Sequence, residues 1–180
     1  MSQVLIAYYS RTGTARQVAQ QLQQLSGWPI GEVRDVRPRA GFAGDLRCVI
    51  DSLFARSGPF TFDGPALESA DHLVVVAPIW VDGLASPMRA MLRQCRAGTA
   101  ARPAGPVSLV CVMSRGGAFR AADEVASIVG AVPAPVLGLK QSDVLSGNVL
   151  ASLQSLVDNV TALDAERVVT RPIWLSPAAA

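Results

Sequence analysis

The sequence predicts a single α/β domain of three layers, in which helices cover both faces of a five-stranded parallel sheet. Apolar runs typical of buried strands alternate along the chain with segments whose apolar residues recur at helical spacing. Parallel strands need a crossover helix between them, so this alternation favours a parallel sheet over hairpins. The length of 180 residues fits one domain, which we expect over residues 1–165 with a tail over 166–180.

The chain begins with a predicted strand, loop and helix. The apolar run over residues 4–9 predicts a buried strand, and apolar residues spaced three and four apart from Ala15 to Leu25 predict a helix. A helix start offers unpaired N–H groups and the positive end of the helix dipole, and Gly13 lets a ligand approach the backbone closely. We therefore predict a phosphate site, with a plain helix cap as the structural alternative. Its residues are Ser10, Arg11, Thr12, Gly13, Thr14 and Ala15.

The next segment predicts an edge strand, a helix and a loop. Residues 30–36 alternate apolar and polar side chains, which is typical of an edge strand with one covered face. Apolar residues at helical spacing from Phe42 to Phe54 predict a helix that ends at Gly58. Residues 60–69 include a Gly-Pro pair and indicate a loop.

The middle of the chain predicts a short buried strand at residues 73–77. His72, the only histidine, stands at its start, where a structural role is favoured over catalysis. The loop that follows, over residues 78–83, carries Trp80 at its tip, and apolar spacing then predicts a helix from Leu84 to Cys95.

The remaining elements continue the alternation. Residues 107–113 predict another buried strand, and a glycine-containing loop follows at 114–120 before a helix over 121–129. Residues 134–140 predict a last strand, which a proline and a glycine weaken, and an apolar stripe over 149–163 predicts the final helix.

Three of these loops follow strands, at residues 10–15, 78–83 and 114–119. In a sheet of order 2-1-3-4-5 the first, third and fourth strands are neighbours, so the three loops converge at the carboxyl ends of the strands. Ligands of open parallel sheets bind at that edge. The sequence contains neither GxGxxG nor GxxxxGK[ST], which disfavours a dinucleotide fold and a nucleoside triphosphatase.

The stretch from Val4 to Leu22 resembles the phosphate-loop signature of flavodoxins, and the resemblance to the flavodoxin-like superfamily covers most of residues 3–165. Ser10, Thr12, Gly13, Ala19 and Leu22 match the signature, whereas Ala7 and Ala15 depart from it. The resemblance implies non-covalent FMN, with its phosphate held at residues 10–15 and its ring held by two later loops. The implied ring contacts are Pro78, Ile79, Trp80, Val81 and Gly83 from one loop and Ser114, Arg115, Gly116, Gly117 and Phe119 from the other. It requires no side chain as an acid or base, so we assign no catalytic residue.

The charge of the chain favours one use of this fold over another. The net charge is +2, whereas electron-carrier flavodoxins are usually strongly acidic. Arg11, Arg115 and Arg120 flank the loops against Asp82, and positive charge near a flavin raises its potential. By resemblance, we expect a two-electron, FMN-dependent NAD(P)H:acceptor oxidoreductase that reduces small quinone-like molecules. The alternatives are a flavodoxin that carries electrons to a redox protein partner and a binding module that has lost the cofactor, for which Ala15 is the only indication.

Composition limits the remaining classes. The mildly basic balance is far from that of a nucleic-acid-binding protein, and no apolar run reaches the roughly 18 residues of a membrane span. Three cysteines inside apolar segments predict buried thiols in a reducing cytoplasm, and no signal peptide is expected. A single histidine without paired cysteines argues against a metal site. The apolar tail around Trp174 would allow a homo-oligomer, as the superfamily resemblance implies.

Overall fold

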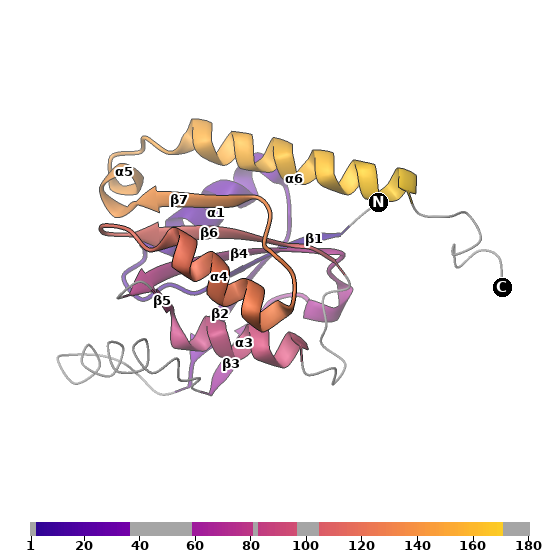
Figure 1. The fold of residues 1–180 in the computed structure, drawn as a ribbon. Coiled ribbons are helices and arrows are strands. Elements are labelled where there is room, and N and C mark those ends of the chain that lie inside the picture. Colours follow the sequence, from indigo (N-terminus) through magenta and orange to yellow (C-terminus); the bar gives the residue numbers. More distant parts are fainter. Residues whose placement is uncertain (1–2, 37–58, 81–82, 97–104, 171–180) are drawn as a thin grey trace.

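In the computed structural model, the described residues are 3–36, 59–80, 83–96 and 105–170, and in them a sheet lies between two layers of helices (Figure 1). The strands are β1 (Val4–Tyr8), β2 (Ile30–Asp35), β3 (Phe60–Asp63), β4 (His72–Trp80), β5 (Gly83–Leu84), β6 (Val107–Met113) and β7 (Val136–Lys140). The helices are α1 (Thr14–Ser26), α3 (Ser86–Arg96), α4 (Ala118–Val129), α5 (Gln141–Leu145) and α6 (Leu150–Thr170), with a 3-10 turn at Leu67–Ser69.

The described sheet has the strand order β3-β2-β1-β4-β6-β7, and β5 pairs with the end of β4. Strands β2, β1, β4, β6 and β7 pair in parallel and correspond to the five predicted strands in the predicted order. The prediction of a five-stranded, wholly parallel sheet is wrong, because β3 and β5 add two antiparallel strands.

Strand β3 corrects the predicted loop at residues 60–69 and the predicted edge position of β2. It pairs antiparallel with β2, from Glu32 opposite Asp63 to Asp35 opposite Phe60. The ring of Phe62 occupies the space beside Gly31, where an added Cβ would lie 2.2 Å from Cζ of the ring. Gly31 therefore leaves room for the Phe62 ring, which a larger residue at this position would displace.

Two apolar cores separate the sheet from its helices. Successive side chains of a strand point to opposite faces, so Leu73 and Val75 of β4 pack toward α3 and α4, whereas Val74 and Val76 pack toward α1 and α6. Figure 1 shows the two helix layers on opposite sides of the sheet. All four side chains are fully buried, which explains why this strand is apolar without alternation.

A buried polar network lies at the amino ends of the strands. His72 is 0% exposed; its Nδ1 lies 2.9 Å from Oδ1 of Asp164 on α6, and its Nε2 lies 2.8 Å from Oγ of Ser108 on β6. The Ser108 hydroxyl donates to the carbonyl of Ala134 at 2.9 Å. The network ties α6 to the sheet, so the only histidine has a structural position.

Several other predicted elements either lie outside the described residues or have different bounds in the structure. The helix predicted from Phe42 to Phe54 and the tail around Trp174 lie outside the described residues. The loop predicted at 78–83 is wrong in part, because Pro78–Trp80 complete β4 and Gly83 belongs to β5. α5 was not predicted, and α6 runs through Thr170, so the domain boundary at residue 165 stays a prediction. None of the described helices is long and apolar enough to cross a membrane.

Candidate functional site

A cleft opens at the carboxyl ends of β1, β4 and β6, which lie side by side in the sheet. This edge is at the left of Figure 1, where α5 follows β7. The cleft is open to solvent, and the space between its protein atoms, including that open part, is about 450 Å³. Its lining residues are Ser10, Arg11, Thr12, Thr14, Ala15, Pro78, Ile79, Val112, Ser114 and Gln141.

The first wall of the cleft is the turn between β1 and α1. Gly13 has φ +93°, a left-handed conformation that favours glycine, and it is the N-cap of α1. As a glycine, it has no side chain to accept hydrogen bonds from the first-turn N–H groups of the helix. The start of α1 therefore has no side-chain cap at Gly13, and the phosphate site there stays a prediction.

The hydroxyl groups of this turn are held by short-range contacts. The N–H of Gly13 donates to Oγ of Ser10 at 3.1 Å, and Oγ1 of Thr12 lies 3.4 Å from Oγ1 of Thr14. Because Ser10 is the acceptor in its bond, its hydroxyl keeps a hydrogen to donate to a ligand. Ala15, in the first turn of α1, is 2% exposed and belongs to the apolar core on that side of the sheet.

The second and third walls come from β4 and β6. Pro78 and Ile79 are half-buried at the end of β4, and Ser114 follows β6. Several predicted site residues are not among the lining residues: Gly13, Gly83, Arg115, Gly116, Gly117 and Phe119. Phe119, in the first turn of α4, is 89% exposed. Trp80 is described only by its backbone, which pairs with Gly83, and Val81 lies outside the described residues.

Two lining residues were missed by sequence reasoning. Val112 reads as an ordinary member of the buried strand 107–113, although its position near the carboxyl end brings it to the cleft. Gln141 begins α5 directly after β7. Because β7 runs parallel to β6, its carboxyl end reaches the same edge of the sheet, and this topological signal would have identified Gln141.

An ion-pair network lies at the same edge, beside the first turn of α1. Arg16 Nη2 lies 2.5 Å from Oε1 of Glu32, and Arg34 Nε lies 2.9 Å from Oε2 of the same carboxylate. Burial of Glu32 opposes its ionisation, but hydrogen bonds from the two arginines hold its pKa below the usual value. The hydrogen bond to Glu32 correspondingly raises the pKa of Arg16.

The strand order and the position of the cleft define an α/β protein of the flavodoxin-like class. No protein-family model matches the sequence, and neither does any curated protein. Several solved structures match over most of this chain. A flavoprotein from Lactobacillus acidophilus in complex with FMN is 17% identical with a TM-score of 0.62, and the alignment covers 81% of this chain and 98% of that one.

Two other similar structures have the same fold. A flavodoxin, WrbA-like protein from Agrobacterium tumefaciens is 10% identical with a TM-score of 0.58, over 90% of this chain and 97% of that one. An NAD(P)H:quinone oxidoreductase from Methanothermobacter marburgensis is 14% identical with a TM-score of 0.53, over 89% of this chain and 100% of that one. These likenesses establish the flavodoxin-like fold of this chain.

Proposed function

We propose that this chain binds FMN non-covalently in the cleft and is an oxidoreductase that transfers two electrons from NAD(P)H to a quinone-like acceptor. The observation that carries the proposal is the convergence of the hydroxyl-bearing turn at the start of α1 with the ends of β4 and β6 in one cleft. The FMN complex and the NAD(P)H:quinone oxidoreductase among the similar structures support it.

The residues of the cleft fit a ligand with a phosphate at one end and a flat ring at the other. The phosphate end offers the hydroxyls of Ser10, Thr12 and Thr14 together with the start of α1. Pro78, Ile79 and Val112 supply apolar surface for the ring. When bound, the flavin supplies the capacity to accept and release a hydride, while this chain binds and orients it.

Charge supports a reductase over an electron carrier. Arg11 is the only charged residue among those that line the cleft in the described part of the chain. Arg11 belongs to the turn proposed for the phosphate, and none of the described lining residues is acidic, so none of them disfavours the anionic reduced flavin. The net charge of +2 also differs from the strongly acidic balance that guides an electron carrier to a basic partner protein.

The first test is an absorbance spectrum of the purified protein, recorded before and after incubation with FMN and desalting. Flavin bands that persist through desalting support the cofactor, and complete release of FMN contradicts it. NADH and NADPH oxidation by the loaded protein, with and without a quinone, then tests the reaction.

Retained flavin without turnover of either nicotinamide would contradict the reductase and favour the electron carrier. A redox titration separates these two outcomes. Two one-electron steps at well-separated potentials indicate a carrier, whereas a single two-electron step indicates a reductase.

A further inference from the structure

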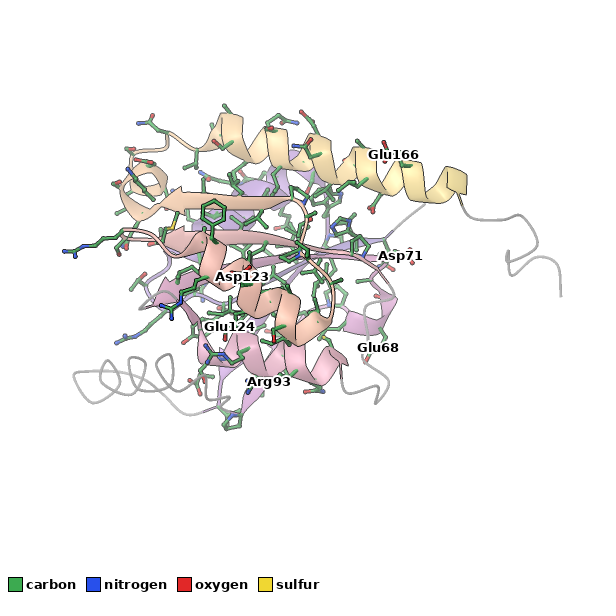
Figure 2. The ribbon with its side chains drawn as sticks, in the orientation of Figure 1. Glu68, Asp71, Arg93, Asp123, Glu124 and Glu166 are labelled. Atoms are coloured by element: carbon green, nitrogen blue, oxygen red, sulfur yellow. The ribbon has the colours of Figure 1, made fainter. Side chains whose placement is uncertain are left out.

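A buried ion pair joins the two helices that lie on one face of the sheet. Arg89 of α3 has a side chain that is 0% exposed, and its Nε donates to Oε1 of Glu124 on α4, whose side chain is 20% exposed. Figure 2 shows Glu124 where α4 faces α3. A fully buried arginine is rare, because its desolvation must be offset by well-placed partners. The position of this pair therefore needs an explanation.

The pair holds the backbone of Leu84 in β5 from both sides. Oε2 of Glu124 accepts the Leu84 N–H at 2.9 Å, and Nη2 of Arg89 donates to the Leu84 carbonyl at 2.8 Å. Leu84 is 0% exposed, so water cannot replace these bonds. Without the pair, a buried donor and a buried acceptor would lose their partners.

Strand β5 connects this pair to the cleft. Leu84 lies opposite Ile79 in the β4–β5 pairing, and Gly83 lies opposite Trp80. In an antiparallel pairing, alternate residues direct their N–H and C=O groups away from the partner strand, and those of Leu84 meet the ion pair instead. Ile79 lines the cleft, so the pair supports one of its walls from behind.

Helix α4 connects the Arg89–Glu124 pair to the third wall of the cleft, which the end of β6 and Ser114 form. This helix has its N-cap at Gly117, three residues after Ser114 of the cleft lining. Glu124 lies on α4 and Arg89 on α3, so the pair fixes the β4–β5 ribbon relative to the helix that follows the third wall.

We infer that Arg89 and Glu124 are positioning residues for the flavin site, which hold the Ile79 wall in the geometry that binds the ring. This inference rests on the proposed function. The residues act through β5 and do not line the cleft. If loss of the pair leaves the wall in the binding geometry for about a tenth of the time, the apparent Kd rises about tenfold.

The test compares Arg89→Met and the milder Glu124→Gln with the control His72→Leu. Arg89→Met and His72→Leu each replace a buried basic side chain with an apolar one and leave a carboxylate without its partner. His72 lies at the opposite edge of the sheet, so its loss should lower the melting temperature without changing the cleft. FMN Kd is measured by quenching of flavin fluorescence, and exchange of the Leu84 amide hydrogen is measured by NMR in the flavin-free protein.

We expect faster exchange of the Leu84 amide and an FMN Kd about tenfold higher in both pair variants, with neither change in His72→Leu. An unchanged Kd in Glu124→Gln, despite a melting temperature as low as that of His72→Leu, would overturn the positioning role and leave the proposed function intact. Absence of FMN binding by the unaltered chain would instead overturn the proposed function, and the positioning role with it.

Discussion

Gly13 is the residue on which the geometry of the predicted phosphate site depends. Its φ of +93° is rarely adopted by other residues, yet an added Cβ would meet no heavy atom within 4 Å. A substitution here therefore strains the backbone without causing a clash. The strain is relieved if the turn changes shape, and this change would move the N–H groups that face the cleft.

We predict that Gly13→Ala lowers the free energy of unfolding by about 1–2 kcal/mol and weakens FMN binding at least severalfold. Gly27→Ala is the matched control, because Gly27 caps the other end of α1 with φ +72° and equally open space. Urea unfolding should show similar losses in both variants, and fluorescence titration should show weaker FMN binding only in Gly13→Ala. Equal FMN affinity in the two variants would contradict a role of Gly13 in FMN binding.

The buried thiols give a second prediction for single residues. Burial raises the pKa of Cys95 to about 11 and that of Cys111 to about 12. A raised pKa keeps a thiol protonated, so at pH 8 only about a thousandth of Cys95 is the reactive thiolate. In a Cys48→Ser variant, both thiols should resist Ellman's reagent until the protein is unfolded in guanidinium. Rapid labelling of the native variant would contradict this assignment.

The sequence could identify residues whose role depends on local geometry, but not those whose role depends on a distant partner. The place of Ser10, Thr12 and Gly13 in the turn between β1 and α1 was predictable, because a strand, a glycine turn and a helix follow one another in the chain. Arg89 and Glu124 are separated by 35 positions, and each reads as an ordinary surface charge on an amphipathic helix. Only the packing of α3 on α4 shows that they meet in the interior.

At the scale of elements, the β2–β3 ribbon is held partly by charge. Glu32 is only 12% exposed and receives hydrogen bonds from Arg16 and Arg34, and Nη2 of Arg34 lies 3.0 Å from Oδ2 of Asp63 on β3. The lowered pKa of Glu32 means that its ionised form favours the folded state. This contribution is complete above the unfolded pKa of about 4.5 and is lost as the pH falls through the lower folded value.

We therefore predict that Glu32→Gln lowers stability at pH 7 by up to about 1 kcal/mol, since partly exposed pairs are screened by solvent. The difference between variant and unaltered chain should shrink as the pH falls below 4.5 and vanish once Glu32 is protonated in the folded protein. Urea unfolding at a series of pH values measures this difference in the free energy of unfolding. A difference that stays constant with pH would show that the effect comes from packing alone.

The short elements β3 and α5 are among those that the sequence analysis did not predict. Strand β3 has four residues between two Gly-Pro pairs, at 58–59 and 64–65, so its flanks indicate a loop. Helix α5 has five residues, too few to display a period. Both form because a neighbour supplies partners, which for β3 are the backbone of β2 and the space beside Gly31. Propensity along the chain carries no information about such partners.

For the whole molecule, the parallel order of the central strands brings three distant segments of the chain into one cleft. The sequence predicted this convergence, because continuous apolar runs and crossover helices permit few other arrangements. It did not predict the antiparallel strands β3 and β5. Strand β3 adds to one edge of the sheet and β5 pairs only with the end of β4, so neither changes the order of the central strands. The predicted homo-oligomer and the domain boundary at residue 165 stay predictions.

If the proposed function is correct, FMN must stabilise the whole domain, because it binds the folded chain alone. At a free concentration of about 100 times Kd, the added stability is about 2.7 kcal/mol, which raises the melting temperature by roughly 5–10 °C. Riboflavin, which lacks the phosphate, is the matched control and should give a much smaller rise. Equal rises with both ligands would place the phosphate outside the turn at the start of α1.

The single histidine, His72, can report by NMR whether the buried network around it is intact. The molecule has one histidine, so a proton spectrum contains one set of imidazole signals and needs no assignment by mutation. Its ring nitrogens are both hydrogen-bonded and 0% exposed, so any proton on them should exchange slowly with water and resonate apart from the amide region. In a series of cleft variants, an unchanged imidazole spectrum would show that the amino ends of the strands, opposite the cleft, keep their structure. A lost cofactor could then be separated from a lost fold within a single sample.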